Sequence, residues 1–181
     1  MSFSKEAMSN LRKRVVPVLL SIIIILSAII IYQNWRFMEE RSRLLEGLQY
    51  SFIDDSLMLS DYMNSLIYSL EHNASLDTLT YVLALNIHFS QELSQDSAEL
   101  HYYTGDGRYY SWWIISRNIR GFFMDAYNNL SESEARLLEK AGLIAEISNL
   151  LRQVREEYNY DLNLVTHEFL NELLSKTQGL S

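Results

Sequence analysis

The feature that most constrains this chain is an apolar run from Val15 to Tyr32 that contains no charged residue. The uncharged stretch continues until Arg36. A helix rises about 1.5 Å per residue, so some 20 apolar residues cross a hydrocarbon core of roughly 30 Å. A single segment must be helical to do so, because lipid offers no hydrogen-bond partner to an open backbone. We therefore predict a transmembrane helix over residues 15–35, held in the lipid bilayer through Val15–Tyr32.

A cleaved signal peptide is the alternative interpretation of the same run. Its apolar region is longer than the roughly 7–15 residues usual for signal peptides, and no small-residue cleavage site follows it. The chain also contains no cysteine, which excludes a lipoprotein anchor. These observations favour an uncleaved anchor with a single pass through the membrane.

The charges on either side of the run predict its orientation. Basic residues dominate before it, whereas arginines and glutamates alternate after it. Lysine and arginine are enriched on the cytoplasmic side of membrane helices. We therefore predict a cytoplasmic tail at residues 1–14 and an extracytoplasmic domain at residues 36–181, in the envelope of a bacterium.

The predicted domain has the composition of a helical protein. It holds about 145 residues, enough for one core, and the whole chain has only one proline and six glycines. Apolar residues repeat every seven positions from Met38 to Leu66. This stripe is typical of a coiled-coil-like packing face. It predicts that the first helix continues beyond the membrane to about His72.

Three further helices are predicted from cap and turn signals. Ser75 is a suitable N-cap for the second helix, and the glycines in 104–107 indicate a break after it. The third helix is predicted over about 109–128. Residues 131–134 read as a capping box that opens the longest helix, whose weakest point is Asn159–Asp161. Four helices joined by short turns predict an all-α fold, an antiparallel up-and-down four-helix bundle.

Aromatic residues concentrate around the second turn, which the helix lengths place on the membrane side of the bundle. We predict that this group contacts the membrane interface or a partner protein, since aromatic residues are enriched at both. The competing interpretation is that the rings fill the core. Two consecutive residues cannot both face inward, so some aromatic surface is expected. The group comprises Tyr102, Tyr103, Tyr109, Tyr110, Trp112 and Trp113.

A second candidate site combines Asp55 with Arg117 and Arg120. Asp55 occupies a position where the stripe of the first helix would otherwise be apolar. A buried carboxylate needs an opposite charge or hydrogen bonds. We predict a pocket for a small polar ligand formed by these three residues. The alternative is that they are solvated or form a structural ion pair.

Several functions are not supported by any motif. His88 and Glu92 share a helix face, and His167–Glu168 begins an HExxH-like pattern, but position 171 is Asn. Two ligands do not make a closed metal site, so we predict no metal, no cofactor and no enzymatic activity. The net charge of −8, without a basic patch in the large domain, also argues against nucleic-acid binding.

The predicted layout resembles the helical-bundle sensing domains of bacterial chemoreceptors and kinases, although those receptors have a second span and a cytoplasmic output domain. We predict an accessory or regulatory subunit that binds another membrane or envelope protein. Two alternatives stay open at this point. One is a small-ligand-sensing bundle that relays through a membrane partner, and the other is a homodimeric structural spacer joined along the first helix.

Overall fold

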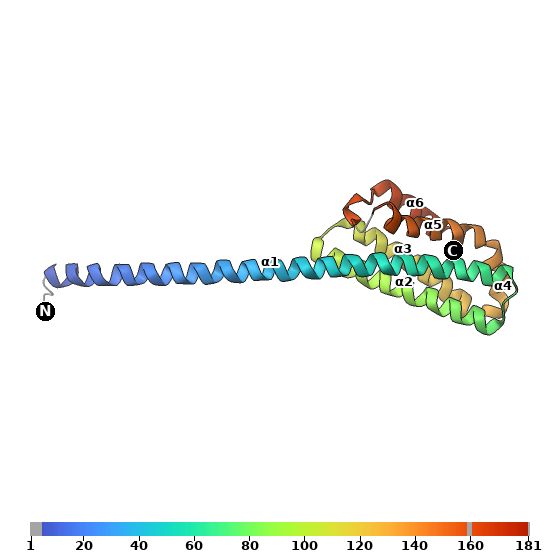
Figure 1. Cartoon of the computed structure of the whole chain (residues 1–181), viewed down its shortest axis with the longest axis horizontal. Helices are drawn as coiled ribbons and strands as arrows, with labels where there is room; N and C mark the ends of the chain where they lie inside the picture. The colour runs from blue at the N-terminus through green and yellow to red at the C-terminus, as the bar shows by residue number, and fades with distance from the viewer. Residues whose placement is uncertain (1–4, 159–160, 181) are drawn as a thin grey trace. The chain divides into compact units, whose positions relative to one another are not determined.

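The computed structural model describes residues 5–158 and 161–180, and most of these residues are helical, with no strand among them (Figure 1). The all-α prediction is therefore confirmed. The chain divides into two compact units, Met1–Leu44 and Leu45–Ser181. The helices are α1 (Lys5–Glu71), α2 (Leu76–Thr104), α3 (Gly107–Asn128), α4 (Leu130–Glu139), α5 (Ala141–Glu156), the 3₁₀ helix η1 (Leu162–Leu164) and α6 (His167–Gln178).

The first unit contains the N-terminal part of α1 and the apolar run. Within the described residues, one helix is long and apolar enough to cross a membrane, and its candidate span begins at Val15. None of its most apolar window is buried against protein. Pro17 lies inside the helix, and the Ser21 hydroxyl donates a hydrogen bond of 2.9 Å to its carbonyl. A signal sequence meets the same criteria of length and composition. Of the predicted tail, residues 5–14 belong to α1 and residues 1–4 lie outside the described part.

In the second unit, the heptad stripe of α1 packs inward. Phe52, Leu59 and Leu66 are fully buried, whereas Met38, which lies in the first unit, is exposed. The helix ends at Glu71, next to the predicted end at His72. The seven-residue repeat of the sequence thus identified the buried side of this helix correctly from Phe52 onward.

The predicted boundaries of α2 and α3 are confirmed to within two residues. The Ser75 side chain accepts a hydrogen bond from the backbone N–H of Thr78, which is the capping interaction expected at the start of α2. Gly105 ends α2 with φ of 71°, a left-handed conformation that glycine adopts without steric strain. Asp106 then caps α3 by accepting a hydrogen bond from the N–H of Arg108.

The predicted long fourth helix is wrong, because this part of the chain forms α4, α5, η1 and α6 instead. The first break lies at Lys140, between α4 and α5. The predicted capping box is also wrong. Asn129, not Ser131, occupies the N-cap position of α4, and its carbonyl accepts from the N–H groups of Glu132 and Ser133.

Two side-chain caps explain why helix does not continue through the second break. The Asp161 carboxylate accepts from the N–H of Asn163 at the start of η1. The Thr166 hydroxyl accepts from the N–H of Phe169 at the start of α6. Such side chains offer the backbone a local alternative to helical hydrogen bonds. The predicted weak point at Asn159–Asp161 falls partly on residues 159 and 160, which lie outside the described part.

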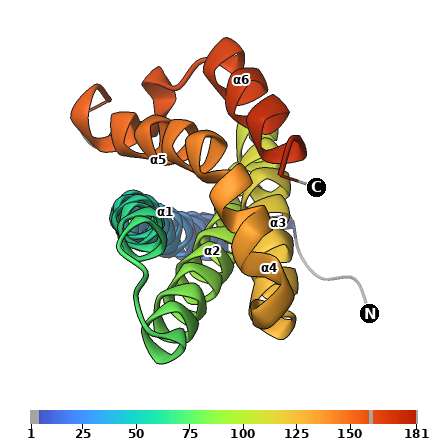
Figure 2. The same ribbon diagram turned by 90° about the vertical axis from the view of Figure 1, so that its right-hand side faces the viewer.

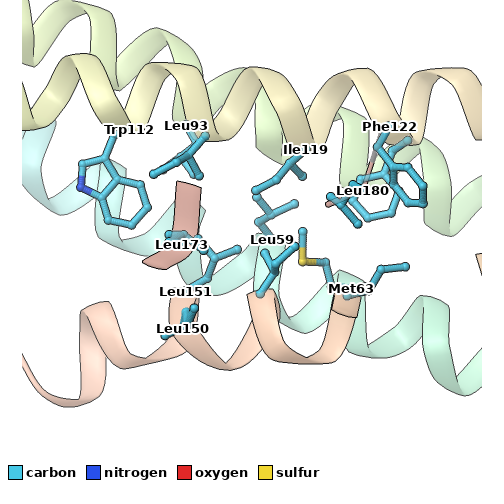
Figure 3. Packing of buried hydrophobic residues seen from close by; sticks show 14 of the residues in the cluster. Leu59, Met63, Leu93, Trp112, Ile119, Phe122, Leu150, Leu151, Leu173 and Leu180 are labelled. Atoms are coloured by element: carbon cyan, nitrogen blue, oxygen red, sulfur yellow. The ribbon is translucent and has the colours of Figure 1, made fainter. Parts of the chain in front are cut away.

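The core is formed where all these helices meet. Figure 2 views the second unit along α1 and shows α2 and α3 beside it, with α5 over α1 and α6 over α3. Side chains from α1, α2, α3, α5 and α6 converge in the centre (Figure 3). The labelled core residues in that view include Leu59, Leu93, Trp112, Ile119, Leu151 and Leu173.

A buried polar contact joins α1 to α5. The hydroxyl oxygens of Ser60 and Ser148 lie 2.9 Å apart, and the Ser148 hydroxyl is also 3.0 Å from the Ser60 carbonyl. Both side chains are fully buried. Serine is small, so the two helix backbones can approach closely at this point.

Arg108 fastens the η1 segment to the start of α3. Its Nη1 donates to the carbonyls of Leu162, Asn163 and Val165 at 3.3, 2.8 and 3.3 Å. The Asp106 carboxylate accepts from its other side. These hydrogen bonds from Arg108 are the main cause that lowers the pKa of Asp106 below its ordinary value. The Arg108 guanidinium therefore donates hydrogen bonds to three backbone carbonyls in and next to η1.

We expect Arg108→Ala to loosen η1 and the first turn of α6 without unfolding the domain. Hydrogen bonds from charged groups contribute about 1.5–3 kcal/mol each, so amide exchange over residues 162–170 should accelerate by about tenfold or more. Hydrogen exchange with mass spectrometry on the full chain in detergent measures this. Arg43→Ala, which breaks an exposed pair with Glu39, is the matched control. Unchanged exchange in Arg108→Ala would show that Arg108 does not hold the segment.

Candidate functional site

The six aromatic residues predicted as a contact surface divide between the core and the surface. Trp112 is 1% exposed, and its ring lies edge-on to Phe52 with centroids 5.1 Å apart. Tyr109 is 3% exposed, and its hydroxyl accepts a hydrogen bond of 3.4 Å from Gln49. These two residues fill the core, as the competing interpretation expected, and offer no contact area to a partner.

The other four residues reach the surface at the end of α2 and the start of α3. Tyr102 is 82% exposed and Tyr110 is 50% exposed. Tyr103 and Trp113 are partly buried. The division follows from helix geometry, because residues three or four apart share a face and consecutive residues do not. For these four residues, contact with a partner or membrane stays a prediction.

Tyr110 and Trp113 form the centre of an exposed ring cluster. Their rings stack with centroids 5.5 Å apart and an interplanar angle of 27°. His101, from the last turn of α2, lies beside Tyr110 with ring centroids 5.9 Å apart. Together with Ala98, these three residues line an open hollow of about 230 Å³. The hollow can accept a side chain of a partner rather than a whole small molecule.

Two arginines extend this cluster along α3. The guanidinium carbon of Arg117 lies 4.5 Å from the centroid of the Trp113 ring, a cation–π contact. Arg117 and Arg120 line a second hollow of about 210 Å³ with Gly121 and Met124. We call the set His101, Tyr110, Trp113, Arg117, Arg120 and Met124 the aromatic–arginine face. Its α3 members lie three or four residues apart, which places them on one side of that helix.

Asp55 lies in a different setting, facing carboxylates rather than arginines. Burial is the largest effect that raises its pKa, from 3.8 to about 7, and the neighbouring charges of Asp96, Glu92 and Asp54 raise it further. Burial also raises the pKa of Asp96, and the Oδ2 atom of this residue is buried without a hydrogen-bond partner among the described residues. The three residues of the predicted ligand pocket therefore occupy two separate settings. A proton held between Asp55 and Asp96 would relieve their repulsion.

Sequence reasoning missed Asp96 as the neighbour of Asp55. The signal was present, because Asp96 lies between the inward-facing Leu93 and Leu100 of α2. Asp55 and Asp96 each lie close to the buried face of their helix, and α1 and α2 are adjacent along the chain. This arrangement indicates that the two carboxylates lie near each other. Reading the helices one at a time did not bring them together.

The histidines do not assemble a metal centre in the part of the chain that the structure describes. His88 Nδ1 lies 3.7 Å from Glu92 Oε1; the His88 side chain is 58% exposed and that of Glu92 is 39% exposed. Across residues 5–158 and 161–180, no group of three histidine, aspartate or glutamate side chains is placed to hold a metal ion. His167 and Glu168 are exposed in the first turn of α6.

Comparison with protein-family models, curated proteins and solved structures found no match for this chain. Its function must therefore be inferred from its own surface and core.

Proposed function

We propose that this chain is a single-pass membrane protein whose helical domain acts as an accessory or regulatory subunit by binding another envelope protein. The aromatic–arginine face is the observation that supports this most directly. The cores of protein interfaces are enriched in Tyr, Trp, Met and Arg. Trp, Tyr and Arg are also the residues whose removal most often weakens binding. All four types occur together on this face.

The proposed topology places residues 1–14 in the cytoplasm and residues 36–181 outside, as an antiparallel helical bundle of a bacterial envelope protein. The exposed apolar run of α1 supports an anchor, because such a surface has a natural environment in lipid. The basic residues that precede it support the orientation. Because α1 anchors the chain, the helical domain does not need to bind lipid, and its surface is available to bind a partner protein.

A ligand-sensing bundle is less well supported by the geometry. The two hollows of the aromatic–arginine face have volumes of about 230 and 210 Å³. Pockets for small molecules usually measure about 300–1,000 Å³. A homodimeric spacer receives some support from Met58 and Tyr68, which are exposed on α1. The mass of a crosslinked adduct distinguishes a dimer from a complex with another protein.

Site-specific photo-crosslinking of the full chain in its native membranes tests the proposal. A photoreactive amino acid at position 110 should give one defined adduct with a membrane or envelope protein. The same group at Tyr81, which is exposed elsewhere on α2, is the control position and should not give that adduct. Trp113→Ala should reduce the adduct from position 110 about tenfold, which corresponds to a loss of roughly 1.4 kcal/mol.

Three other results would count against a partner on this face. No adduct at position 110, or the same adduct at both positions, would contradict the proposal. An adduct of twice the mass of this chain would favour the homodimeric spacer. Trp112→Ala is unsuitable for this experiment because its side chain lies in the core.

A further inference from the structure

Resting on the proposed function, we propose that the partner presents an acidic segment to the aromatic–arginine face. Carboxylates of that segment pair with Arg117 and Arg120, and a neighbouring apolar side chain enters the hollow beside Tyr110 and Trp113.

Arg117 and Arg120 differ from five other arginines of the chain, because those five form ion pairs within it. Arg36, Arg43, Arg108, Arg136 and Arg152 each form an ion pair with an acidic residue of this chain. Arg117 and Arg120 form none with the described residues, although the chain carries 23 acidic residues against 15 lysines and arginines. Two neighbouring cations without acidic partners, in an acidic protein, give this face a charge opposite to that of the protein as a whole.

The second observation concerns the state of each guanidinium group. The guanidinium carbon of Arg117 lies over the Trp113 ring, and the residue is exposed, so a partner can reach its N–H groups. Arg120 lines the hollow beside Arg117, although its Nε atom is buried and out of reach of a partner. A carboxylate is the acceptor that suits both groups, because it can receive two parallel hydrogen bonds from one guanidinium.

The third observation distinguishes a protein segment from a lipid headgroup. The arginine hollow adjoins the hollow formed by Ala98, His101, Tyr110 and Trp113. A site with an aromatic pocket next to two cations fits an acidic segment that also carries an apolar residue. A phosphate headgroup would use the cations and leave the aromatic pocket empty.

The test uses the crosslink from position 110 in the full chain in native membranes. Arg117→Glu/Arg120→Glu should reduce the protein adduct at least tenfold, because like charges then face each other. Arg117→Lys/Arg120→Lys should retain most of it. The matched control, Arg41→Glu/Arg155→Glu, makes the same change in net charge on α1 and α5 and should leave the adduct intact. Mass spectrometry of the wild-type adduct should locate aspartates or glutamates beside the crosslinked residue of the partner.

A charge exchange then completes the test. Replacing those partner carboxylates by lysine should restore the adduct of the double glutamate variant. If an adduct forms equally well with Arg117→Glu/Arg120→Glu, the acidic-segment proposal is overturned while binding at this face stands. If the adduct is a lipid, or if wild type gives none, both proposals fail. Circular dichroism of each variant identifies any loss that results from unfolding.

Discussion

Trp112→Ala is expected to destabilise the helical domain by about 3–5 kcal/mol, the range observed when large aromatic residues are removed from cores. The Trp112 ring contacts Phe52 from α1 and Phe169 from α6. Its removal would therefore leave a cavity where three helices meet. Since single domains are stable by only about 5–15 kcal/mol, this loss is a large part of the total.

The neighbouring tryptophan provides the matched comparison. Trp113→Ala should cost about 1 kcal/mol or less, because it removes a stacked ring and a cation–π contact at the surface. Urea titration of the full chain in detergent, followed by circular dichroism, measures both variants. Equal losses for the two substitutions would mean that Trp112 does not lie at the centre of the packed core.

Asp55→Asn is expected to stabilise the domain at neutral pH and to flatten its pH dependence. The pKa of Asp55 is raised to about 7 in the folded state, chiefly by burial. The folded state therefore holds a proton that the unfolded state releases near pH 4. Stability from this group is fully present below about pH 4 and is lost as the pH rises to about 7. The shift corresponds to about 4 kcal/mol, and solvent screening at this half-buried site reduces it to about 1–2 kcal/mol.

Thermal unfolding of the full chain in detergent between pH 4 and pH 8 measures the effect. At pH 7.5 the Asn variant should melt about 3–6 °C above wild type, and the difference should shrink toward pH 4. Asp54→Asn, which changes an exposed carboxylate on the preceding residue, is the control and should have a smaller effect. A wild-type slope that persists in Asp55→Asn would show that this carboxyl does not control the pH response.

The structure agrees with the sequence where a cap or turn coincides with a change in the apolar pattern. Ser75 and Gly105 mark such places, and both helix ends were predicted correctly. The fourth predicted helix failed because Leu137, Ile144 and Leu151 keep one seven-residue spacing across the break at Lys140. The spacing of apolar residues shows which side chains are buried, but the same spacing can continue across a helix break. It therefore did not reveal the break at Lys140.

The division of the aromatic residues was only partly predictable. Helix geometry requires Trp112 and Trp113 to face different ways, but which of them is buried depends on where α1 and α6 pack. The meeting of Asp55 with Asp96 depends in the same way on the pairing of α1 with α2. Such contacts between distant positions follow from tertiary packing, which a single sequence read helix by helix does not give.

The paired hydroxyls of Ser60 and Ser148 restrict how α1 can move against the rest of the domain. Sliding α5 past this helix by one turn would separate them and leave two polar groups dehydrated inside the protein. Piston-like displacement between these two helices is therefore disfavoured. A mechanical signal that entered through α1 would have to carry α5 with it as a single body.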